Sequence, residues 1–162
     1  MKVYFLRHAT ASDEARTDEE RELTREGKRE AHVLGAALVR MGAKPIHIFS
    51  SPLVRAWQTA RMVAKVMQFS SKVEELSELK NETSTSALLR VLRSCDQDQE
   101  IFLVGHAPSL PQHMAALVGA KRFNGFALGK GGAACVEWPA SRLGEGQLIW
   151  LMRQKQLRLV AG

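Results

Sequence analysis

Two histidines and two arginines of this sequence each follow a short apolar segment that is typical of a buried strand. They are Arg7 and His8 after residues 3–6, Arg55 shortly after residues 46–49, and His106 just after residues 101–104. In open sheets with parallel strands, ligands bind beyond the carboxyl ends of the strands. We therefore expect the four side chains to converge at one sheet edge. Each residue alone is commonly a solvated loop or helix residue, so the convergence of all four indicates a site.

Side chains of these types are suited to phosphoryl transfer. Guanidinium groups offer planar sets of donors that match the oxygens of a phosphate. An imidazole between two arginines feels like-charge repulsion, which favours its neutral form. A neutral imidazole has an unprotonated nitrogen that can attack phosphorus. The second imidazole can hydrogen-bond the transferred group and stabilise charge in the transition state. The set predicts transfer of phosphate to a histidine and then to water.

Metal and nucleotide chemistry fit these residues less well. No HExxH or DxD motif and no Cys/His cluster accompanies the histidines, and neighbouring arginines would repel a metal ion. The segment GFALGKGG at 125–132 lacks the GxxxxGK[ST] spacing and has no Ser or Thr after its lysine. Its glycines are expected to form a turn before a strand at Ala133. We therefore expect neither a metal nor a cofactor.

The order of predicted elements indicates an α/β fold. Apolar segments predict strands, and apolar residues at helical spacing predict helices between them. The predicted strands are 3–6, 46–49, 101–104, 133–138 and 148–152, and the predicted helices are about 24–41, 52–67, 86–94 and 108–118. Such alternation predicts three layers, α/β/α, around a mostly parallel central sheet. Residues 1–162 are expected to form a single domain, because no linker or repeat interrupts them.

Composition and charge narrow the class of protein. The 162 residues are 45% hydrophobic and 25% charged, as in soluble globular proteins. A formal net charge of +6 either aids solubility or attracts an anionic substrate. Few aromatics and no block of basic residues argue against nucleic-acid binding. No apolar segment approaches the roughly 20 residues that cross a bilayer, and no signal peptide is evident. We expect a cytoplasmic protein without membrane attachment, in which Cys95 and Cys135 are free thiols.

Three motifs resemble the histidine phosphatase superfamily, also called the phosphoglycerate-mutase-like superfamily. They are LRHA at 6–9, SSPLVRAWQTA at 50–60 and VGHAP at 104–108. In that order they correspond to the RHG motif, the SPxxRAxQT block and the later GH motif of the superfamily. Each motif follows a predicted strand, and their order agrees with the family. The resemblance implies the phosphoglycerate-mutase-like fold, here without a large cap insertion.

The resemblance also implies a role for each residue that was singled out. His8 would be the phosphorylated nucleophile, with Arg7, Arg55 and His106 around the phosphate. Ala9 stands where the family usually has glycine. Alanine would be strained there only if the position needed a positive φ or a close backbone approach.

Within the superfamily, the chain is similar to the SixA branch of phosphohistidine phosphatases. The chain is short, and ELTREGKREA at 22–31 resembles the LTxxG helix start of that branch. The interval between Arg55 and His106 has no large helical insertion of the kind that caps small-molecule members. The resemblance implies a metal-independent enzyme of signal transduction that acts on phosphohistidine in a partner protein, such as a phosphotransfer domain or phosphocarrier. It implies Arg21 as a further phosphate ligand, and we expect the chain to act as a monomer.

The resemblance leaves the general acid open. Many superfamily members use a glutamate after the second motif, and Glu78 within ELSELKNE at 75–82 is the nearest match. Asp18, in a predicted loop, is another candidate. SixA-like proteins are often regarded as lacking this acid. A phosphoramidate bond is labile and phosphohistidine can carry its own ring proton, whereas an ester needs proton donation more.

Two other functions stay open at this stage. A phosphatase of small phosphate monoesters would use the same residues. A catalytically idle module that binds phosphoproteins would also need the arginines, but it would have no use for a nucleophilic histidine. Mutase activity fits least, because reorientation of a small bisphosphate is better served by a capped pocket.

Overall fold

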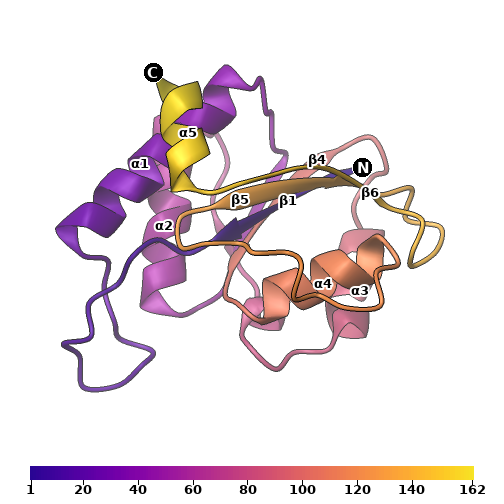
Figure 1. Ribbon diagram of the computed structural model, residues 1–162, viewed down its shortest axis with the longest axis horizontal. Coiled ribbons are helices and arrows are strands. Elements are labelled where there is room, and N and C mark those ends of the chain that lie inside the picture. Colours follow the sequence, from indigo (N-terminus) through magenta and orange to yellow (C-terminus); the bar gives the residue numbers. More distant parts are fainter.

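The computed structural model describes all 162 residues, and its first strand, β1 (Lys2–Arg7), lies inside a six-stranded sheet (Figure 1). The other strands are β2 (His47–Ser50), β3 (Glu74–Glu75), β4 (Glu100–Gly105), β5 (Ala133–Glu137) and β6 (Gln147–Met152). The strand order is β3-β2-β4-β1-β5-β6. The first four strands of this order are parallel, while β5 is antiparallel to both β1 and β6. The predicted mostly parallel sheet is therefore confirmed.

Helices cover both faces of this sheet. They are α1 (Arg25–Arg40), α2 (Val54–Val66), α3 (Thr85–Arg93), α4 (Ser109–Leu117) and α5 (Gln154–Ala161), with a short 3₁₀ helix, η1 (Ser77–Leu79). In Figure 1, α1, α2 and α5 lie on one side of the sheet, and α3 and α4 lie on the other. This is the predicted three-layer arrangement. None of the helices is both long and apolar enough to cross a bilayer.

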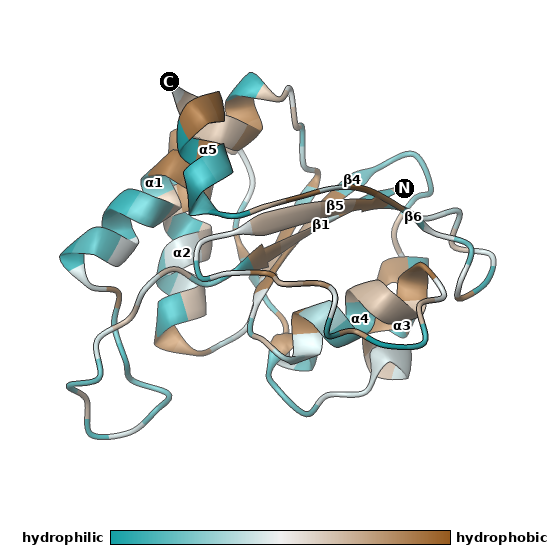
Figure 2. Ribbon diagram, in the orientation of Figure 1, coloured by the Kyte–Doolittle hydropathy of each residue, from teal (hydrophilic) through white to brown (hydrophobic).

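The side chains of β1 alternate between two hydrophobic cores. Val3 and Phe5 pack in the core beneath α3 and α4, whereas Tyr4 and Leu6 pack in the core beneath α1, α2 and α5. The side chains of β4 alternate in the same way. A strand that is covered on both faces needs apolar residues at every position, which explains the uninterrupted apolar segments in the sequence. Figure 2 shows hydrophobic colours on the central strands and hydrophilic colours on much of α1.

The start of α1 packs closely against the segment that follows His8. The side-chain oxygen of Thr24 caps the helix by accepting a hydrogen bond from Gly27 N–H at 3.0 Å. Thr10 O accepts a hydrogen bond from Thr24 N–H, also at 3.0 Å. A Cβ atom on Gly27 would lie 1.9 Å from Thr10 O, so only glycine fits at this contact. The cap therefore anchors α1 beside the end of β1.

Two parts of the fold were not predicted from the sequence. Helix α5 was missed, because it is short and buries only Leu157 completely. Segment 73–79 has no clear periodicity, and the structure divides it between β3 and η1. In β3, Glu74 pairs with Phe49 of β2, so the tertiary pairing rather than the local sequence makes it a strand.

We expect Gly27→Ala to destabilise the protein by about 1–3 kcal/mol, because the added methyl group overpacks the contact with Thr10. In an ordinary helix interior, the same change stabilises by up to about 1 kcal/mol. The free energy of unfolding in urea measures the effect. Gly125→Ala is the matched control, since a Cβ atom there meets nothing within 4 Å. Equal stability of the two variants would contradict this account of the α1 start.

Candidate active site

The parallel pairing of β1 and β4 brings the two predicted histidines together. Arg7 lies opposite Gly105 in the register, so the chains of His8 and His106 leave the sheet side by side. His8 N–H donates to Gly105 O at 3.0 Å, and the two imidazole rings are 5.0 Å apart between centroids. His8 is 7% exposed and His106 is 1% exposed. The structure therefore holds two nearly buried imidazoles in contact.

The start of α2 brings Arg55 to the same edge. Strand β2 pairs with β4, and just beyond it Ser51 N–H donates to Val104 O at 2.9 Å. Helix α2 begins three residues later, and Arg55 in its first turn is only 5% exposed. The positive charge of Arg55 contributes to lowering the pKa of both His8 and His106. All four predicted residues thus converge at one end of the sheet.

A hydrogen bond to the backbone fixes the tautomer of His8. Its Nδ1 lies 2.8 Å from the carbonyl oxygen of Ala9. A carbonyl oxygen can only accept, so Nδ1 carries the proton and donates it. The other ring nitrogen, Nε2, then keeps its lone pair. Nε2 is therefore the ring nitrogen of His8 with nucleophilic character.

Burial and nearby cations keep the His8 ring neutral. Its pKa falls from the ordinary 6.5 to about 4, chiefly through desolvation and further through the charges of Arg55, Arg7 and Lys130. The hydrogen bond to Ala9 O acts in the opposite direction. At pH 7 the lone pair on Nε2 is thus free for attack.

His106 bonds to the protein through its Nε2, whereas His8 does so through its Nδ1. Its Nε2 lies 2.8 Å from the hydroxyl oxygen of Ser51, which itself accepts a hydrogen bond from Leu53 N–H at 3.3 Å. Because this oxygen already accepts from Leu53 N–H and no other protein acceptor is bonded to it, we infer that the Ser51 hydroxyl donates its proton to Nε2 of His106. The ring proton then sits on Nδ1, which is buried and has no partner in the protein. Burial and the neighbouring His8 lower the pKa of His106 to about 3. His106 therefore offers an unused N–H donor to a ligand.

A loop from the far end of the chain positions Arg7. Its guanidinium donates to Leu128 O at 3.0 Å, and its backbone N–H donates to Gly132 O at the same distance. Gly131, in the left-handed region with φ +62, donates its N–H to His8 O at 3.0 Å. The glycine segment forms the predicted turn before β5, but sequence reasoning missed that it contacts the site and carries Lys130 there. The Nε atom of Arg7 is buried without a partner, a second unused donor.

Two polar residues of α2 hold the chain segments around the site. Ala9 N–H donates to the hydroxyl of Thr59 at 3.1 Å, and that hydroxyl donates to Arg55 O at 2.7 Å. Gln58 accepts a hydrogen bond from Leu23 N–H at 2.7 Å. The Gln–Thr pair of the SPLVRAWQT motif thus ties the segments after β1 to α2, which explains why these residues accompany the arginine.

Alanine at position 9 is compatible with the site. Ala9 is completely buried beside Leu23 and Ala31, and it is not among the residues with a positive φ. The position therefore needs a small side chain, and glycine is not required for its backbone conformation.

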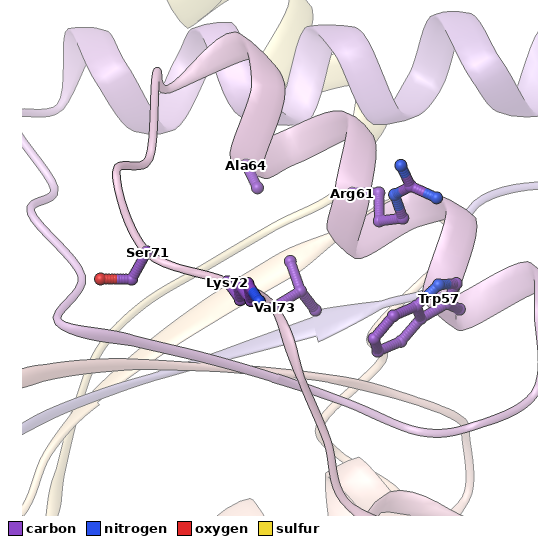
Figure 3. A pocket seen from close by; sticks show the side chains of 6 residues that line it. All are labelled: Trp57, Arg61, Ala64, Ser71, Lys72 and Val73. Atoms are coloured by element: carbon purple, nitrogen blue, oxygen red, sulfur yellow. The ribbon is translucent and has the colours of Figure 1, made fainter.

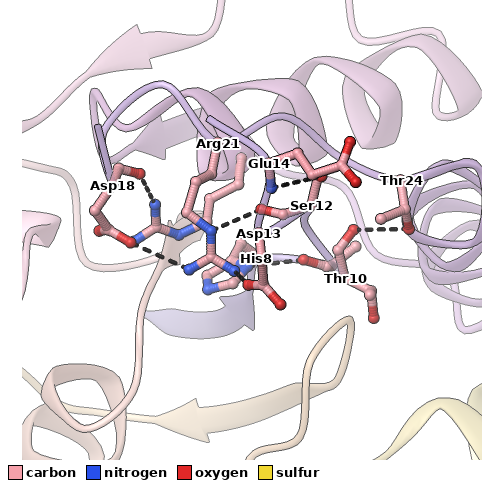
Figure 4. A network of polar contacts seen from close by, with 10 residues as sticks. His8, Thr10, Ser12, Asp13, Glu14, Asp18, Arg21 and Thr24 are labelled. Atoms are coloured by element: carbon pink, nitrogen blue, oxygen red, sulfur yellow. Dashed lines mark hydrogen bonds and ion pairs between the residues drawn. The ribbon is translucent and has the colours of Figure 1, made fainter. Parts of the chain in front are cut away.

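Of the remaining predicted residues, only Asp18 bonds to one of the four central residues, Arg55. Arg21 donates to Asp18 at 3.1 Å, forms a second ion pair with Asp13, and donates from Nε to Ser12 O at 2.7 Å (Figure 4). The two arginines Arg21 and Arg55 lower the pKa of Asp18, so its carboxyl is ionised and has no proton to give. The carboxylate of Glu78, in η1, accepts from the Ser77 hydroxyl at 3.0 Å and bonds to none of the four central residues.

A separate hollow lies along the outer flank of α2. It has a volume of about 330 Å³ and contains none of the four central residues, and Figure 3 shows its lining from α2 and the segment before β3. The lining residues are Trp57, Arg61, Ala64, Ser71, Lys72 and Val73. No group of three or more His, Cys, Asp or Glu side chains is placed to hold a metal ion.

Comparison with known proteins defines the class. The model of the histidine phosphatase superfamily (branch 1) matches residues 3–84, half of the chain. The chain therefore belongs to this superfamily. An uncharacterised protein of Picosynechococcus sp. is 29% identical over 147 residues, which are 88% of each chain.

Solved structures show the same fold. The protein histidine phosphatase SixA, in complex with tungstate, has a TM-score of 0.89 at 24% identity, over 97% of this chain and 99% of that one. A SixA candidate from Agrobacterium tumefaciens has a TM-score of 0.79 at 23% identity, over 94% and 97%. A phosphoserine phosphatase variant from Entamoeba histolytica has a TM-score of 0.73 at 17% identity, over 96% and 98%. The chain is thus a superfamily enzyme with a small SixA-like fold.

We expect the His8 ring to titrate near pH 4, and we expect Lys130→Gln to raise its pKa, because one of the charges opposing ring protonation is removed. Lys130 is exposed, so the variant should fold normally. Titration of the ring signals by NMR measures the shift. Lys121→Gln, another exposed lysine, is the control and should leave the His8 pKa unchanged. Identical titration curves for both variants would rule out a contribution of Lys130 to the site.

We expect Ser51→Ala to release the tautomer of His106 and to lower kcat roughly five- to tenfold, the equivalent of one lost hydrogen bond. Nitrogen NMR of the imidazoles should show loss of the form protonated on Nδ1, a change that a general loss of stability would not produce. Ser50→Ala is the matched control, since that buried hydroxyl donates to Ser51 O at 3.0 Å and forms no hydrogen bond with a histidine. An unchanged His106 spectrum in Ser51→Ala would show that the serine does not set the tautomer.

Proposed function

We propose that this chain is a phosphohistidine phosphatase that removes phosphate from a histidine of a partner protein and passes through a phosphorylated His8. The observation that carries the proposal is the buried, neutral His8, whose Nε2 is free beside Arg7, Arg55 and His106. Phosphate binding alone requires cations but no nucleophile. An imidazole with a fixed tautomer and a low pKa is instead suited to covalent catalysis.

In the first step, Nε2 of His8 attacks phosphorus and a P–N bond forms. The P–N bond of the substrate breaks, and its electron pair returns to the substrate ring. A substrate ring that is protonated on its other nitrogen leaves as neutral imidazole. Arg7 and Arg55 hold the phosphate oxygens, and the Nδ1–H of His106 donates to one of them.

In the second step, water attacks the phosphorus of phospho-His8. An O–P bond forms, the P–Nε2 bond breaks, and the electron pair returns to Nε2, while the water proton leaves with the phosphate product or the solvent. The bond from Nδ1–H to Ala9 O serves both steps. It leaves Nε2 unprotonated for attack, and it keeps the phosphorylated ring protonated on Nδ1, so that neutral imidazole is again the leaving group.

Two features support phosphohistidine in a protein as the substrate. Only β3, η1 and α3 lie between α2 and β4, so no large insertion caps the site. The nearest candidate acids are also engaged: Asp18 is ion-paired with Arg55 and Arg21, and Glu78 accepts from Ser77. A phosphate ester, whose leaving alkoxide needs a proton, is served less well by such a site.

We expect His8→Ala to reduce turnover of a phosphohistidine protein by at least about a thousandfold, because the covalent route is removed. The wild-type enzyme, quenched during turnover, should carry an acid-labile phosphate that peptide mapping places on His8. His113→Gln is the control, since His113 is a buried histidine that bonds to Thr85 and lies outside the site. Normal turnover by His8→Ala would reject the mechanism.

The substrate class is tested in parallel. Wild-type enzyme is assayed on a phosphohistidine peptide, a phosphorylated phosphotransfer domain and a panel of small phosphate esters. A higher kcat/KM for the phosphohistidine substrates supports the proposal. A preference for an ester overturns the substrate assignment while leaving the role of His8 intact. Tight binding of the phosphoprotein without turnover identifies a binding module instead.

A further inference from the structure

The long loop between β1 and α1 places a carboxylate on a phosphate-binding arginine. Arg55 donates from one terminal nitrogen to Asp18 O at 2.6 Å and from the other to Asp18 Oδ2 at 2.8 Å. The Arg55 side chain is 7% exposed, whereas the Asp18 side chain is 60% exposed. A buried guanidinium is thus paired with an anion that arrives from a solvent-facing loop.

The same carboxylate also engages the second arginine of the rim. Asp18 Oδ1 accepts from Arg21 at 3.1 Å, while Oδ2 is held by Arg55 (Figure 4). The two oxygens of one anion therefore link two guanidinium groups, a geometry that a phosphate can also provide. The charge of Asp18 also counteracts the lowering of the His106 pKa, which places it within electrostatic reach of the pocket.

The neighbouring residue of the loop occupies the start of α2. Glu19 O accepts the hydrogen bond of Val54 N–H at 3.0 Å, and Leu53 provides no side-chain cap. The N-terminus of a helix favours anions, because its first N–H groups lack partners within the helix. Asp18 and Glu19 thus bind three donors at the start of α2 that a phosphate could use. These donors are the two terminal nitrogens of Arg55 and the backbone N–H of Val54. Farther inside, the Nε of Arg7 and the Nδ1 of His106 keep no partner.

We propose that Asp18 is an internal competitor for the phosphate site: its carboxylate occupies Arg55 and Arg21 in the empty enzyme, and the incoming phosphate displaces it. This inference rests on the proposed role of Arg55 in phosphate binding and adds a determinant of affinity to it. Displacement of this one carboxylate frees one terminal nitrogen of each guanidinium group, Nη2 of Arg55 and Nη1 of Arg21, in a single event.

The competition has a consequence for product release. While Asp18 is bound to Arg55, the site does not accept phosphate. The apparent affinity for phosphate is therefore the intrinsic affinity multiplied by the fraction of molecules in which Asp18 is not bound. A dianionic phosphoryl group competes better than a singly charged ligand such as a carboxylate. When phosphate leaves, Asp18 returns and the arginines are paired again. The loop therefore favours turnover over retention of product.

The test is the affinity for inorganic phosphate, which needs no substrate and no turnover. We expect Asp18→Asn to bind phosphate at least fivefold more tightly than wild type in calorimetric titrations, because the amide keeps the size of the side chain but removes its charge. Asp13→Asn is the matched control: Asp13 pairs with Arg21 but not with Arg55, so its phosphate affinity should stay within twofold of wild type. Urea unfolding of both variants checks that the fold is intact.

Three results of this titration would contradict the proposal. Unchanged or weaker phosphate binding by Asp18→Asn overturns the proposal, and weaker binding shows that Asp18 instead positions Arg55. Equal tightening in Asp13→Asn also overturns it, because a general loss of negative charge would then explain the effect. A failure of the phosphohistidine assay leaves this result untouched, so the two proposals fall separately.

Discussion

The site depends on the register between β1 and β4. Arg7 lies opposite Gly105, and this pairing places the next residue of each strand, His8 and His106, in contact. The register is itself fixed by the two cores. If the register of β1 shifted by one residue, Phe5 and Leu6 would each face the other layer of helices, and so would every other side chain of the strand. The packing of apolar residues therefore determines the distance between two polar rings that are not themselves part of either core.

Burial then decides the chemical state of those rings. Desolvation is the largest cause of the lowered pKa of both His8 and His106, ahead of the nearby positive charges. A protonated imidazole among arginines would be repelled as well as poorly solvated, so both rings are neutral at pH 7. Neutrality is useful only because each ring has one defined tautomer. Ala9 O holds the proton of His8 on Nδ1, and the Ser51 hydroxyl leaves the proton of His106 on the nitrogen without a partner.

The sequence predicts these central residues because His8 and His106 directly follow strands and Arg55 lies in the helical turn just after one. A polar residue after a buried strand of a parallel sheet reaches one edge whatever the details of packing, so His8, Arg55 and His106 could be collected before their distances were known. Contacts across long sequence separations could not be found in this way. Leu128 O accepts a hydrogen bond from Arg7 across 121 positions of sequence, and the glycine segment around Lys130 predicts a turn but no contact with the site. Tautomers are equally invisible, because they depend on which acceptor lies beside each ring. Helix α5 was missed because it is short and buries only Leu157 completely, so few apolar positions mark it in the sequence.

Arginines that bind phosphate pose a problem when the phosphate is absent. A guanidinium that is nearly buried, like that of Arg55, costs free energy when its donors lack acceptors. The loop after β1 supplies an acceptor for each terminal nitrogen of Arg55, the backbone carbonyl and the carboxylate of Asp18. The inner donors, on Arg7 and His106, have no such substitute. A phosphoryl group carries several anionic oxygens that can accept hydrogen bonds from donors of these types. The donors are thus paired at Arg55 and unpaired at Arg7 and His106, beside the His8 ring that we propose as the nucleophile.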